Sequence, residues 1–361
     1  MHDPMNDPMN DPVIAPVADP VDPAPRTAPR TAPLTVLVTG GSGFLGTSVV
    51  RALAERGHRV VSADLQLPAV ATPGVEHVRM DVTDADLVDQ VFAGTVASGG
   101  GTSAERGIDV VVHLASVVTP GRDSSREQEY AVDVTGTHHV LDACLAHGVR
   151  RVVVSSSGAA YGYHPDNGAA NGGWLTEDDP LRGNVEFAYS DHKRQVEEML
   201  AGLRETRPEL EQVVLRIGTI LGERVDNQIT ALFEKKRLIK IKGYDSPFVF
   251  VWDADVVGAI EQAVVGKVTG VFNVAGDGCL TVDEIARRLG KGTVVLPEAV
   301  LQQVLRIGRS LRLSRYGPEQ TVFLAHRPVL DNFRLKSELG YEPAKTSAEA
   351  FEAWRLARAR R

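Results

Sequence analysis

The stretch TGGSGFLG (Thr39–Gly46) decides the fold through what lies on either side of it. The apolar run LTVLVTG (Leu34–Gly40) precedes it and is typical of a buried β-strand. Apolar residues at helical spacing follow it, from Phe44 to Leu53, and predict an amphipathic helix. A strand, a glycine turn and a helix in this order place backbone amides and the positive end of the helix dipole at the turn, where they can bind a phosphate group.

The same alternation of strand and helix continues along the chain. Near-continuous apolar strands between amphipathic helices indicate a parallel sheet covered on both faces. We expect further strands within residues 58–64, 75–82, 108–115, 149–157 and 210–218, smaller elements at 247–252 and 270–276, and helices within 84–92, 123–147 and 187–204. The predicted fold class is therefore α/β, a doubly wound parallel sheet of the Rossmann type with a smaller C-terminal substrate-binding lobe.

The composition of the 361 residues limits the classes of function. A formal net charge of −8 argues against a nucleic-acid partner, because duplex binding needs a basic surface. The sequence contains neither an apolar run of membrane-spanning length nor the layout of a signal peptide, so we expect no integral membrane association and a cytoplasmic location. Cys144 and Cys279 are too few for a disulfide framework, and Cys144 lies on an apolar helical pattern typical of a buried thiol. The histidines lack metal-ligand spacing, and we predict no metal.

Asp64, at the end of the second expected strand, makes the glycine turn more specific. An acidic residue at this position accepts hydrogen bonds from the ribose hydroxyls of a dinucleotide and repels a 2′-phosphate. Neither the turn nor the neighbouring Leu65 and Gln66 offers an Arg or Lys that could hold such a phosphate. The sequence therefore predicts NAD as the cofactor in preference to NADP.

Shifts in composition suggest how the chain is divided. Residues 1–33 are rich in Pro, which removes backbone donors, and we expect a disordered tail there. We expect an NAD-binding Rossmann domain over 34–276, with lobe insertions near 163–183 and 223–246. A mainly substrate-binding lobe is expected over 277–350 and a C-terminal helix end over 351–361. The glycine-rich segments 94–107 and 167–173 are predicted to be mobile surface loops.

Several motifs together resemble the extended short-chain dehydrogenase/reductase family, in particular its NAD-dependent epimerase/dehydratase branch, over about Leu34 to Ala350. The matching stretches are TGGSGFLG for the family's TGxxGxxG turn, MDVTD (Met80–Asp84) for its adenine contacts, HLAS (His113–Ser116) for its strand end beside the cofactor, VVVSSSGAAYG (Val152–Gly162) for its serine strand and YSDHK (Tyr189–Lys193) for its YxxxK motif. The cofactor-binding residues that the turn and the resemblance imply are Gly40, Gly43, Phe44, Leu45, Gly46, Asp64, Asp81, Val82, Leu114, Ala115, Ser116, Tyr189 and Lys193.

The resemblance also implies that Tyr189, Lys193 and Ser157 are catalytic. A substrate hydroxyl needs a base to take its proton while hydride leaves the same carbon toward nicotinamide. Tyrosine alone is too weak an acid, with a reference pKa of about 10, but positive charge on Lys193 and on the oxidised nicotinamide favours its phenolate. Ser157 would hydrogen-bond the reacting oxygen, and the neighbouring Ser156 is an alternative for this role.

Three positions depart from the family pattern. Asp133, in DVTGT (Asp133–Thr137), stands where the family usually has Asn, so the role of that Asn in ordering the site is open here. Thr219 stands where many nucleotide-sugar enzymes have Asn. The segment Asp245–Val257 lacks the Arg that commonly meets the diphosphate of a sugar nucleotide. These departures leave the substrate open.

Three functions are therefore considered, each with a small-molecule substrate or ligand. The leading one is an epimerase or dehydratase that oxidises a sugar hydroxyl, expected on a nucleotide sugar, to a transient ketone and returns the hydride in the same cycle. The second is a dehydrogenase or reductase of a hydroxysteroid-like or other lipophilic alcohol, for which the amphipathic segment Glu298–Gly317 is a candidate surface, although an ordinary lobe helix with a basic face also explains it. Its arginines are an alternative source of phosphate contacts. The third is a non-catalytic NAD-sensing protein. As in relatives, a homodimer is expected through the helices at Asp123–His147 and Phe187–Arg204.

Overall fold

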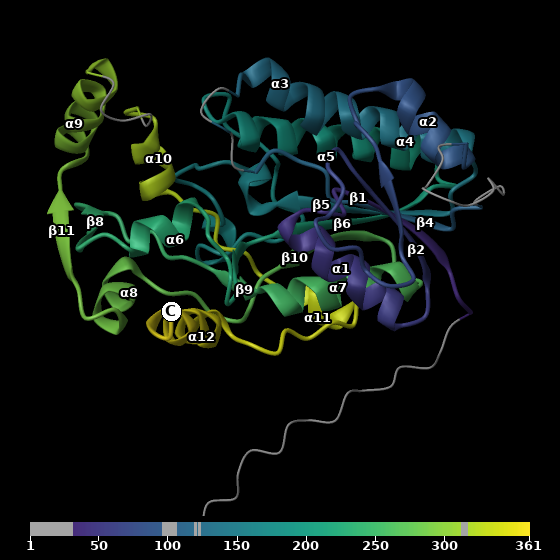
Figure 1. Cartoon of the computed structure of the whole chain (residues 1–361). Helices are drawn as coiled ribbons and strands as arrows, with labels where there is room; N and C mark the ends of the chain where they lie inside the picture. Colours follow the sequence, from purple (N-terminus) through teal and green to yellow (C-terminus); the bar gives the residue numbers. More distant parts are fainter. Residues whose placement is uncertain (1–31, 96–106, 119–120, 122–123, 312–316) are drawn as a thin grey trace, which may run out of the picture. The chain divides into compact units, whose positions relative to one another are not determined.

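Seven parallel strands form the central sheet, in the order β10-β6-β5-β4-β1-β2-β3 (Figure 1). This computed structural model describes residues 32–95, 107–118, 121, 124–311 and 317–361. The strands are β1 (Thr35–Thr39), β2 (Arg59–Asp64), β3 (Glu76–Arg79), β4 (Val110–His113), β5 (Arg151–Ser157), β6 (Glu211–Ile217) and β10 (Gly270–Val274). The order reverses between β1 and β4, and in open α/β sheets such a reversal opens a crevice at the carboxyl ends of the strands.

The expected parallel, doubly wound sheet is therefore present, but the element at 270–276 is more than a small accessory. It is β10, which pairs with β6 over five residues and extends the central sheet at its edge. Residues 1–31 and 96–106, which contain most of the predicted tail and of the first glycine-rich loop, lie outside the described residues, as do Asp123, Arg312 and Arg315.

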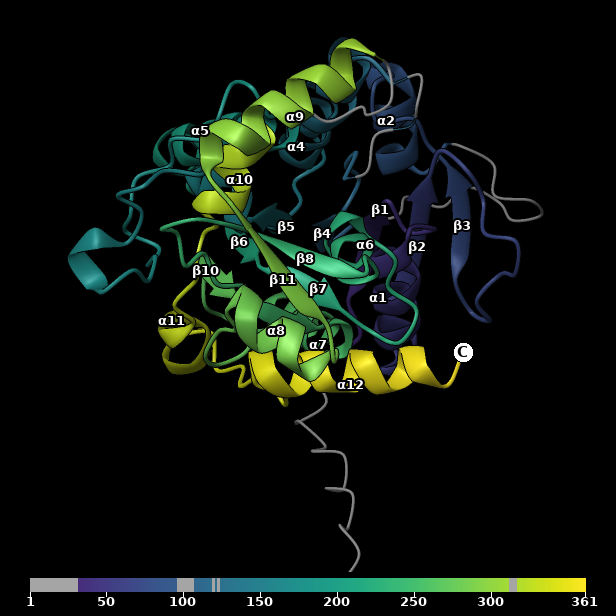
Figure 2. The same ribbon diagram turned by 90° about the vertical axis from the view of Figure 1, so that its left-hand side faces the viewer.

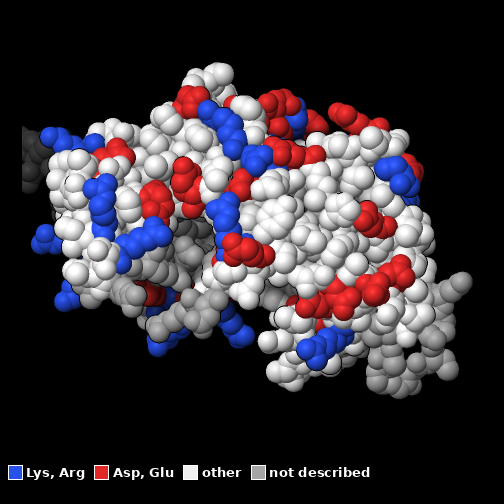
Figure 3. All heavy atoms as spheres, turned by 90° about the horizontal axis from the view of Figure 1, so that it is seen from above, with Lys and Arg blue, Asp and Glu red and all other residues white. Residues whose placement is uncertain are grey.

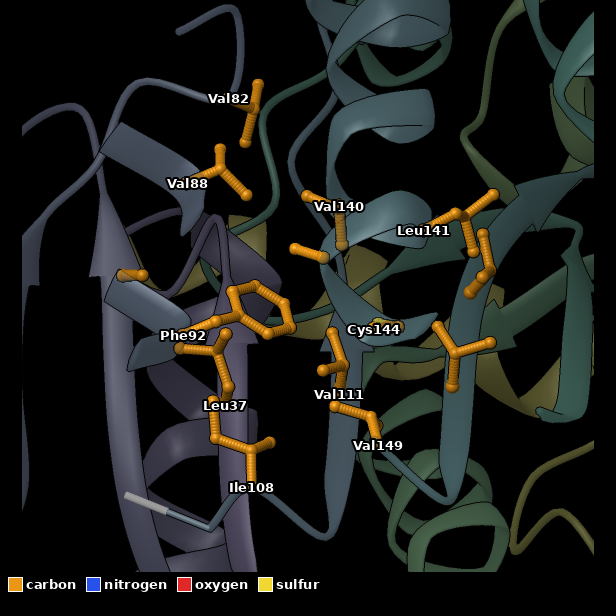
Figure 4. Packing of buried hydrophobic residues seen from close by; sticks show 14 of the residues in the cluster. Leu37, Val82, Val88, Phe92, Ile108, Val111, Val140, Leu141, Cys144 and Val149 are labelled. Atoms are coloured by element: carbon orange, nitrogen blue, oxygen red, sulfur yellow. The ribbon is translucent and has the colours of Figure 1, made fainter. Parts of the chain in front are cut away.

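Helices cover both faces of the sheet because the side chains of each strand alternate between two apolar layers. In β1, Leu37 belongs to the layer beneath α2 (Ala85–Ala93), α4 (Gly136–Ala146) and α5 (Ala188–Thr206). Val36 and Val38 belong to the opposite layer, against α1 (Phe44–Glu55) and α7 (Asp253–Val265). Figure 4 shows the first layer, where the Cys144 side chain lies between α4 and the sheet. Cys144 is fully buried and free, as predicted, and burial raises the pKa of its thiol.

The helix expected over residues 123–147 is continuous from Arg126 to Ala146 and contains one π-helical turn. It consists of α3 (Arg126–Tyr130), a π-helical turn η1 (Ala131–Thr135) and α4, with helical dihedral angles at both junctions. A π-helical turn inserts one residue into the helical ladder and is often found at functional sites. Here it contains Asp133.

The remaining elements lie beyond the carboxyl edge of the sheet or along its end (Figures 1 and 2). Two small parallel pairs form, β7 (Thr219–Leu221) with β9 (Phe250–Trp252), and β8 (Arg237–Ile241) with β11 (Gly292–Leu296). Figure 2 shows β8, β11 and α8 side by side, with α9 following β11. The other elements are η2 (Gly158–Tyr161), η3 (Ala169–Asn171), α6 (Gln228–Phe233), α8 (Val282–Arg288), α9 (Glu298–Ser310), α10 (Gln320–Ala325), α11 (Phe333–Ser337) and α12 (Ser347–Ala359).

The surface of the described residues carries both signs of charge. Seen from above, over the helices of the first layer, acidic and basic side chains are interspersed on the visible described face and form no continuous basic area (Figure 3). No helix in the described ranges is both long enough and apolar enough to cross a membrane.

Candidate active site

The glycine turn joins β1 to α1 through very close backbone contacts. Gly40 has φ +68°, and a Cβ there would lie 2.8 Å from the amide nitrogen of Ala115. A Cβ on Gly46 would lie 2.0 Å from the carbonyl oxygen of Gly40. Gly43, at the N-cap of α1, supplies no side-chain hydrogen bond, so the first amides of the helix, at Phe44 and Leu45, remain available for an anion. The turn therefore has the shape and donors that a pyrophosphate needs.

The Asp64 carboxylate closes one side of this turn. Its Oδ2 accepts a hydrogen bond of 3.0 Å from the amide of Ser42, and its Oδ1 accepts one of 3.2 Å from the amide of Gln66. These bonds hold the carboxylate at the end of β2, beside the glycine turn. A ribose hydroxyl can bind the same group, as the sequence predicts.

The other predicted cofactor residues lie at neighbouring strand ends. Asp81 follows β3 and accepts hydrogen bonds from Thr83, while Val82 is buried beside it. Leu114, Ala115 and Ser116 follow β4, and the amide of Leu114 donates to the carbonyl of Thr39 at 3.1 Å. The structure thus brings the predicted residues to one edge of the sheet.

Tyr189 and Lys193 lie one turn apart near the start of α5 and face the end of β5. Lys193 Nζ is 5.7 Å from the centre of the Tyr189 ring and donates a hydrogen bond of 2.9 Å to the carbonyl of Ser155. Ser157, the last residue of β5, interacts with the Tyr189 hydroxyl. The three residues predicted to be catalytic therefore lie together.

Burial controls the ionisation of this group. It raises the pKa of Tyr189 to about 12, although the hydrogen bond with Ser157 acts in the opposite direction. Burial also lowers the pKa of Lys193, while the negative charges of Asp133 and Glu197 raise it. A phenolate at Tyr189 therefore depends on positive charge close to it.

Ser156 and Ser157 point in different directions, as neighbouring residues of a strand must. Ser156 Oγ donates to Glu197 Oε1 at 2.5 Å, and Glu197 forms a buried ion pair with Arg216 at 2.8 Å. The hydroxyl of Ser156 is therefore engaged in this buried network. Ser157, the one that faces Tyr189, is better placed to bind a reacting oxygen.

His113 ends β4 within a directed chain of hydrogen bonds. The hydroxyl of Thr137 donates to the carbonyl of Asp133 at 2.5 Å, so its oxygen accepts from His113 Nε2 at 2.9 Å. His113 Nδ1 consequently accepts from the hydroxyl of Thr39 at 2.7 Å. Burial lowers the pKa of His113 to about 3, so it is a neutral structural link between β1, β4 and η1.

Arg327 is a buried cation that no sequence motif singles out. It is 9% exposed, its Nη1 donates to the carbonyl of Ser246 at 2.7 Å, and its guanidinium carbon lies 3.8 Å from the centre of the Phe248 ring. Its Nε has no hydrogen-bond partner in the described structure. Burial lowers the pKa of Arg327 to about 9. A buried guanidinium with an N–H donor that lacks a partner is suited to binding an anion.

Aromatic residues connect Arg327 to the start of α5, which carries Tyr189. The guanidinium carbon of Arg327 lies 5.2 Å from the centre of the Phe323 ring, which packs edge-on against Tyr163 at 5.2 Å. Tyr163 packs in the same way against Phe187, at the N-cap of α5. Burial raises the pKa of Tyr163, and the positive charge of Arg327 opposes this rise. These residues come from distant parts of the sequence, which explains why spacing alone did not identify them.

The arginines of α9 are placed differently. Arg309 is 60% exposed and pairs with Glu319, and Arg306 bonds Gln303 on the surface. Within the described ranges, no group of three or more His, Cys, Asp or Glu side chains could hold a metal ion.

Comparison with known proteins identifies the family of this chain. The sequence profile of the NAD-dependent epimerase/dehydratase family matches residues 36–275. An uncharacterized protein of Mycobacterium bovis is 27% identical over 323 residues, which cover 88% of this chain and 82% of the relative. UDP-glucose 4-epimerase 2 of Oryza sativa subsp. japonica is 32% identical over 202 residues, which cover 52% of this chain and 45% of the relative.

A solved structure shares the fold. The complex of UDP-glucose 4-epimerase from Thermus thermophilus with NAD superposes with a TM-score of 0.65 at 24% identity, over 90% of this chain and 99% of the other. The central sheet and the helices on both of its faces are common to the two proteins.

Proposed function

Because this chain belongs to the NAD-dependent epimerase/dehydratase family, and is therefore an NAD-dependent enzyme, we propose that it oxidises a hydroxyl of a nucleotide sugar to a transient ketone and reduces it again in the same cycle. The observation that carries the choice of substrate is Arg327, a buried cation without a carboxylate partner among the described residues. The diphosphate of a nucleotide sugar would supply the missing anion.

The residues at the end of β5 and the start of α5 divide the chemistry between them. The chemistry that bound NAD would supply at this site is that of a hydride acceptor for the oxidation and of a hydride donor for the reduction. Tyr189 takes the proton of the substrate hydroxyl and later gives it back. Lys193 favours the phenolate through its charge, and Ser157 binds the reacting oxygen while negative charge develops on it.

The cofactor is held, in this proposal, by the residues at the carboxyl ends of β1, β2, β3 and β4. The amides of the glycine turn bind the pyrophosphate, and Asp64 binds the adenosine ribose. The close contacts of Gly40 and Gly46 leave no room for larger side chains, so the backbone itself lines the phosphate site.

Arg327 and the aromatic residues packed near it would give the proposed substrate site a defined chemistry. Phe248 lies against the guanidinium, and Tyr163 packs edge-on against both Phe323 and Phe187. A substrate that reaches from Arg327 to Tyr189 therefore needs an anionic group at one end and a hydroxyl at the other. A sugar joined to a nucleoside diphosphate meets both requirements.

Calorimetric titration of the NAD-loaded protein with UDP and with UDP-glucose tests this substrate class. We expect Arg327→Met, which keeps an aliphatic stem over Phe248, to weaken binding about tenfold or more, the scale of one lost charge-assisted hydrogen bond. Arg309→Met, which removes an exposed arginine of α9, is the matched control and should bind both ligands as the wild-type protein does. Wild-type protein that binds neither ligand, or Arg327→Met protein with unchanged affinity, contradicts the proposal.

A second function is favoured by one surface. Four apolar side chains of α9 and its C-cap are 46–62% exposed: Val300, Val304, Ile307 and Leu311. Such a surface suits a lipophilic alcohol, which a dehydrogenase would oxidise with release of NADH. Native mass spectrometry separates the two functions, because an epimerase or dehydratase retains stoichiometric NAD and a dehydrogenase accumulates NADH in solution.

The dimer and the cytoplasmic location remain predictions. The dimer would form through α3, η1, α4 and α5, and sedimentation of a monomer at micromolar concentration would contradict it. Cell fractionation tests the location. The NAD-sensing alternative requires that replacement of Tyr189 leave function intact, a test described in the Discussion.

A further inference from the structure

The Asp133 carboxylate is buried at the centre of three donors. It is 3% exposed and lies in the π-helical turn η1. Its Oδ1 accepts hydrogen bonds from the amide of Val117 at 2.8 Å and the hydroxyl of Ser116 at 2.9 Å. Its Oδ2 lies 3.1 Å from Nδ1 of His192. The carboxylate thus joins the segment after β4, which lines the cofactor edge of the sheet, to the catalytic helix α5.

His192 is the other half of this contact. It lies on α5, next to Lys193 in the sequence, and is completely buried. The ring of Tyr130 packs edge-on against it at 5.5 Å, and its Nε2 has no hydrogen-bond partner among the described residues. Burying an imidazole nitrogen without a hydrogen-bond partner reduces the stability of the fold. The bond between Nδ1 and Asp133 is therefore the stabilising interaction that His192 makes here.

A negative charge at Asp133 acts on both catalytic residues of α5. It raises the pKa of Lys193 and also that of Tyr189. In return, the positive charge of Lys193 and the hydrogen bonds from His192, Val117 and Ser116 lower the pKa of Asp133. The carboxylate therefore stays ionised although it is buried.

Apart from Lys193, the described titratable groups around this contact do not oppose the negative charge of Asp133. His113, on β4, is neutral because burial lowers its pKa to about 3. Glu197, one turn beyond Lys193, is paired with Arg216. From β5, Ser157 contacts Tyr189 without a charge, and Tyr163 is held neutral because burial raises its pKa. Asp133 is therefore the one described carboxylate of the site that acts on Tyr189 without an arginine partner.

We propose that Asp133 and His192 form a positioning pair that fastens the catalytic helix to the cofactor edge of the sheet and places a fixed negative charge beside Tyr189 and Lys193. This inference rests on the proposed role of Tyr189 as the proton carrier. The pair makes Tyr189 hold its proton more tightly than a neutral residue at position 133 would. A phenolate at Tyr189 is then a stronger base, which favours the half of the cycle in which Tyr189 takes the proton of the substrate hydroxyl.

Replacing Asp133 by Asn separates the charge from the hydrogen bonds. The Asn oxygen can still accept from Val117 and Ser116, and its amide can donate to His192 Nδ1 in the other tautomer of the ring. Ultraviolet absorbance of the NAD-loaded protein follows tyrosine ionisation between about pH 7 and pH 13, a range that includes both the ordinary tyrosine pKa and the raised pKa of Tyr189, about 12. The difference between each protein and its partner carrying Tyr189→Phe isolates the Tyr189 transition.

We expect the Tyr189 transition in Asp133→Asn to lie about one pH unit below that of the wild-type protein, the scale of one nearby charge. A transition at the same or at a higher pH, or no Tyr189 transition in either protein, overturns the proposed charge effect. No sugar substrate enters this measurement, so the result is independent of the nucleotide-sugar assignment.

Hydrogen–deuterium exchange tests whether the pair holds α5 against the segment after β4. His192→Leu removes the bond to Asp133, whereas His192→Asn places an amide where Nδ1 stood and can retain it. We expect the segment 114–117 to exchange at least severalfold faster in His192→Leu and at the wild-type rate in His192→Asn. Equal exchange in His192→Leu and the wild-type protein, or no rescue by Asn, overturns the positioning role.

Discussion

Lys193 Nζ lies 5.7 Å from the centre of the Tyr189 ring while its hydrogen bond to the Ser155 carbonyl, 2.9 Å long, fixes it to β5. The helical spacing of four residues brings the two side chains to the same face of α5. The strand then determines where the lysine points. The orientation of the pair is therefore a property of two elements, and a change in either residue should affect catalysis more than folding.

Tyr189→Phe should abolish turnover and leave NAD bound. The variant removes the hydroxyl that carries the proton, and loss of an acid/base group lowers rates by about 10²–10⁴-fold. Retained NAD is measured by native mass spectrometry and turnover with the substrate identified by calorimetry. Tyr341→Phe is the matched control, because the Tyr341 hydroxyl also has a buried partner, Asp255 at 3.1 Å, on the opposite face of the sheet. Equal turnover in the two variants would falsify the role of Tyr189.

Gly40→Ala should destabilise the fold and weaken NAD binding together. The residue has φ +68°, and its Cβ would meet the backbone of Ala115 at 2.8 Å. Backbone strain and overpacking together should cost about 2–4 kcal/mol in the free energy of unfolding. Gly74 has φ +75° but open space around it, so Gly74→Ala should cost only about 1 kcal/mol, from strain alone. Urea denaturation of both variants checks the difference, and equal losses would show that the close contact is unimportant.

Most of the sheet could be predicted from the sequence because its strands are buried on both faces. Continuous β-branched runs such as RVVVSSS (Arg151–Ser157) have no competing helical period. The glycine turn and Asp64 were also predictable, since their positions follow from the strand ends. The π-helical turn η1 was not, because a single five-residue turn is too short for its period to be distinguished from that of the α-helices on either side.

The proposed substrate-binding residues could not be predicted from the sequence. Arg327 becomes a buried cation only when Phe248 and Phe323 pack against it, and these contacts join segments whose order along the chain says nothing about their proximity. The Asp133 substitution was visible, but its partner His192 was not. In the sequence, His192 is simply one of the residues between Tyr189 and Lys193. Only the structure shows that its side chain faces Asp133.

Asp64→Asn combined with Leu65→Arg should shift the cofactor preference from NAD toward NADP. Asn can still accept the hydrogen bond from the Ser42 amide, so the turn keeps its shape while the charge that repels a 2′-phosphate is lost. Arginine at position 65, which is half exposed, supplies a phosphate ligand. The ratio of the two dissociation constants should change about tenfold or more, the equivalent of one charge-assisted hydrogen bond. Leu65→Arg alone is the control. An unchanged ratio of dissociation constants in the double variant would show that Asp64 does not bind the ribose.

His113 should make the protein less stable in mild acid. Its pKa is lowered by burial from 6.5 to about 3, so between these values the unfolded chain binds a proton that the folded chain does not. Stability therefore rises with pH across this window and is lost as the pH falls below 6.5. From pH 7 to about pH 4 this one group should cost about 3 kcal/mol, at 1.36 kcal/mol for each unit.

The comparison of two histidine variants isolates this effect from that of the carboxylates. His113→Gln has no group that titrates at this position, and its Nε2 can still donate to Thr137. Urea denaturation at several pH values should show a free energy of unfolding that falls less steeply in His113→Gln than in the wild-type protein. His138, on the exposed face of α4, serves as the control, and His138→Gln should follow the wild-type curve closely. Parallel curves for His113→Gln and the wild-type protein would mean that His113 takes up a proton in the folded state as it does in the unfolded chain, and Nδ1 would then donate to the Thr39 hydroxyl instead of accepting from it.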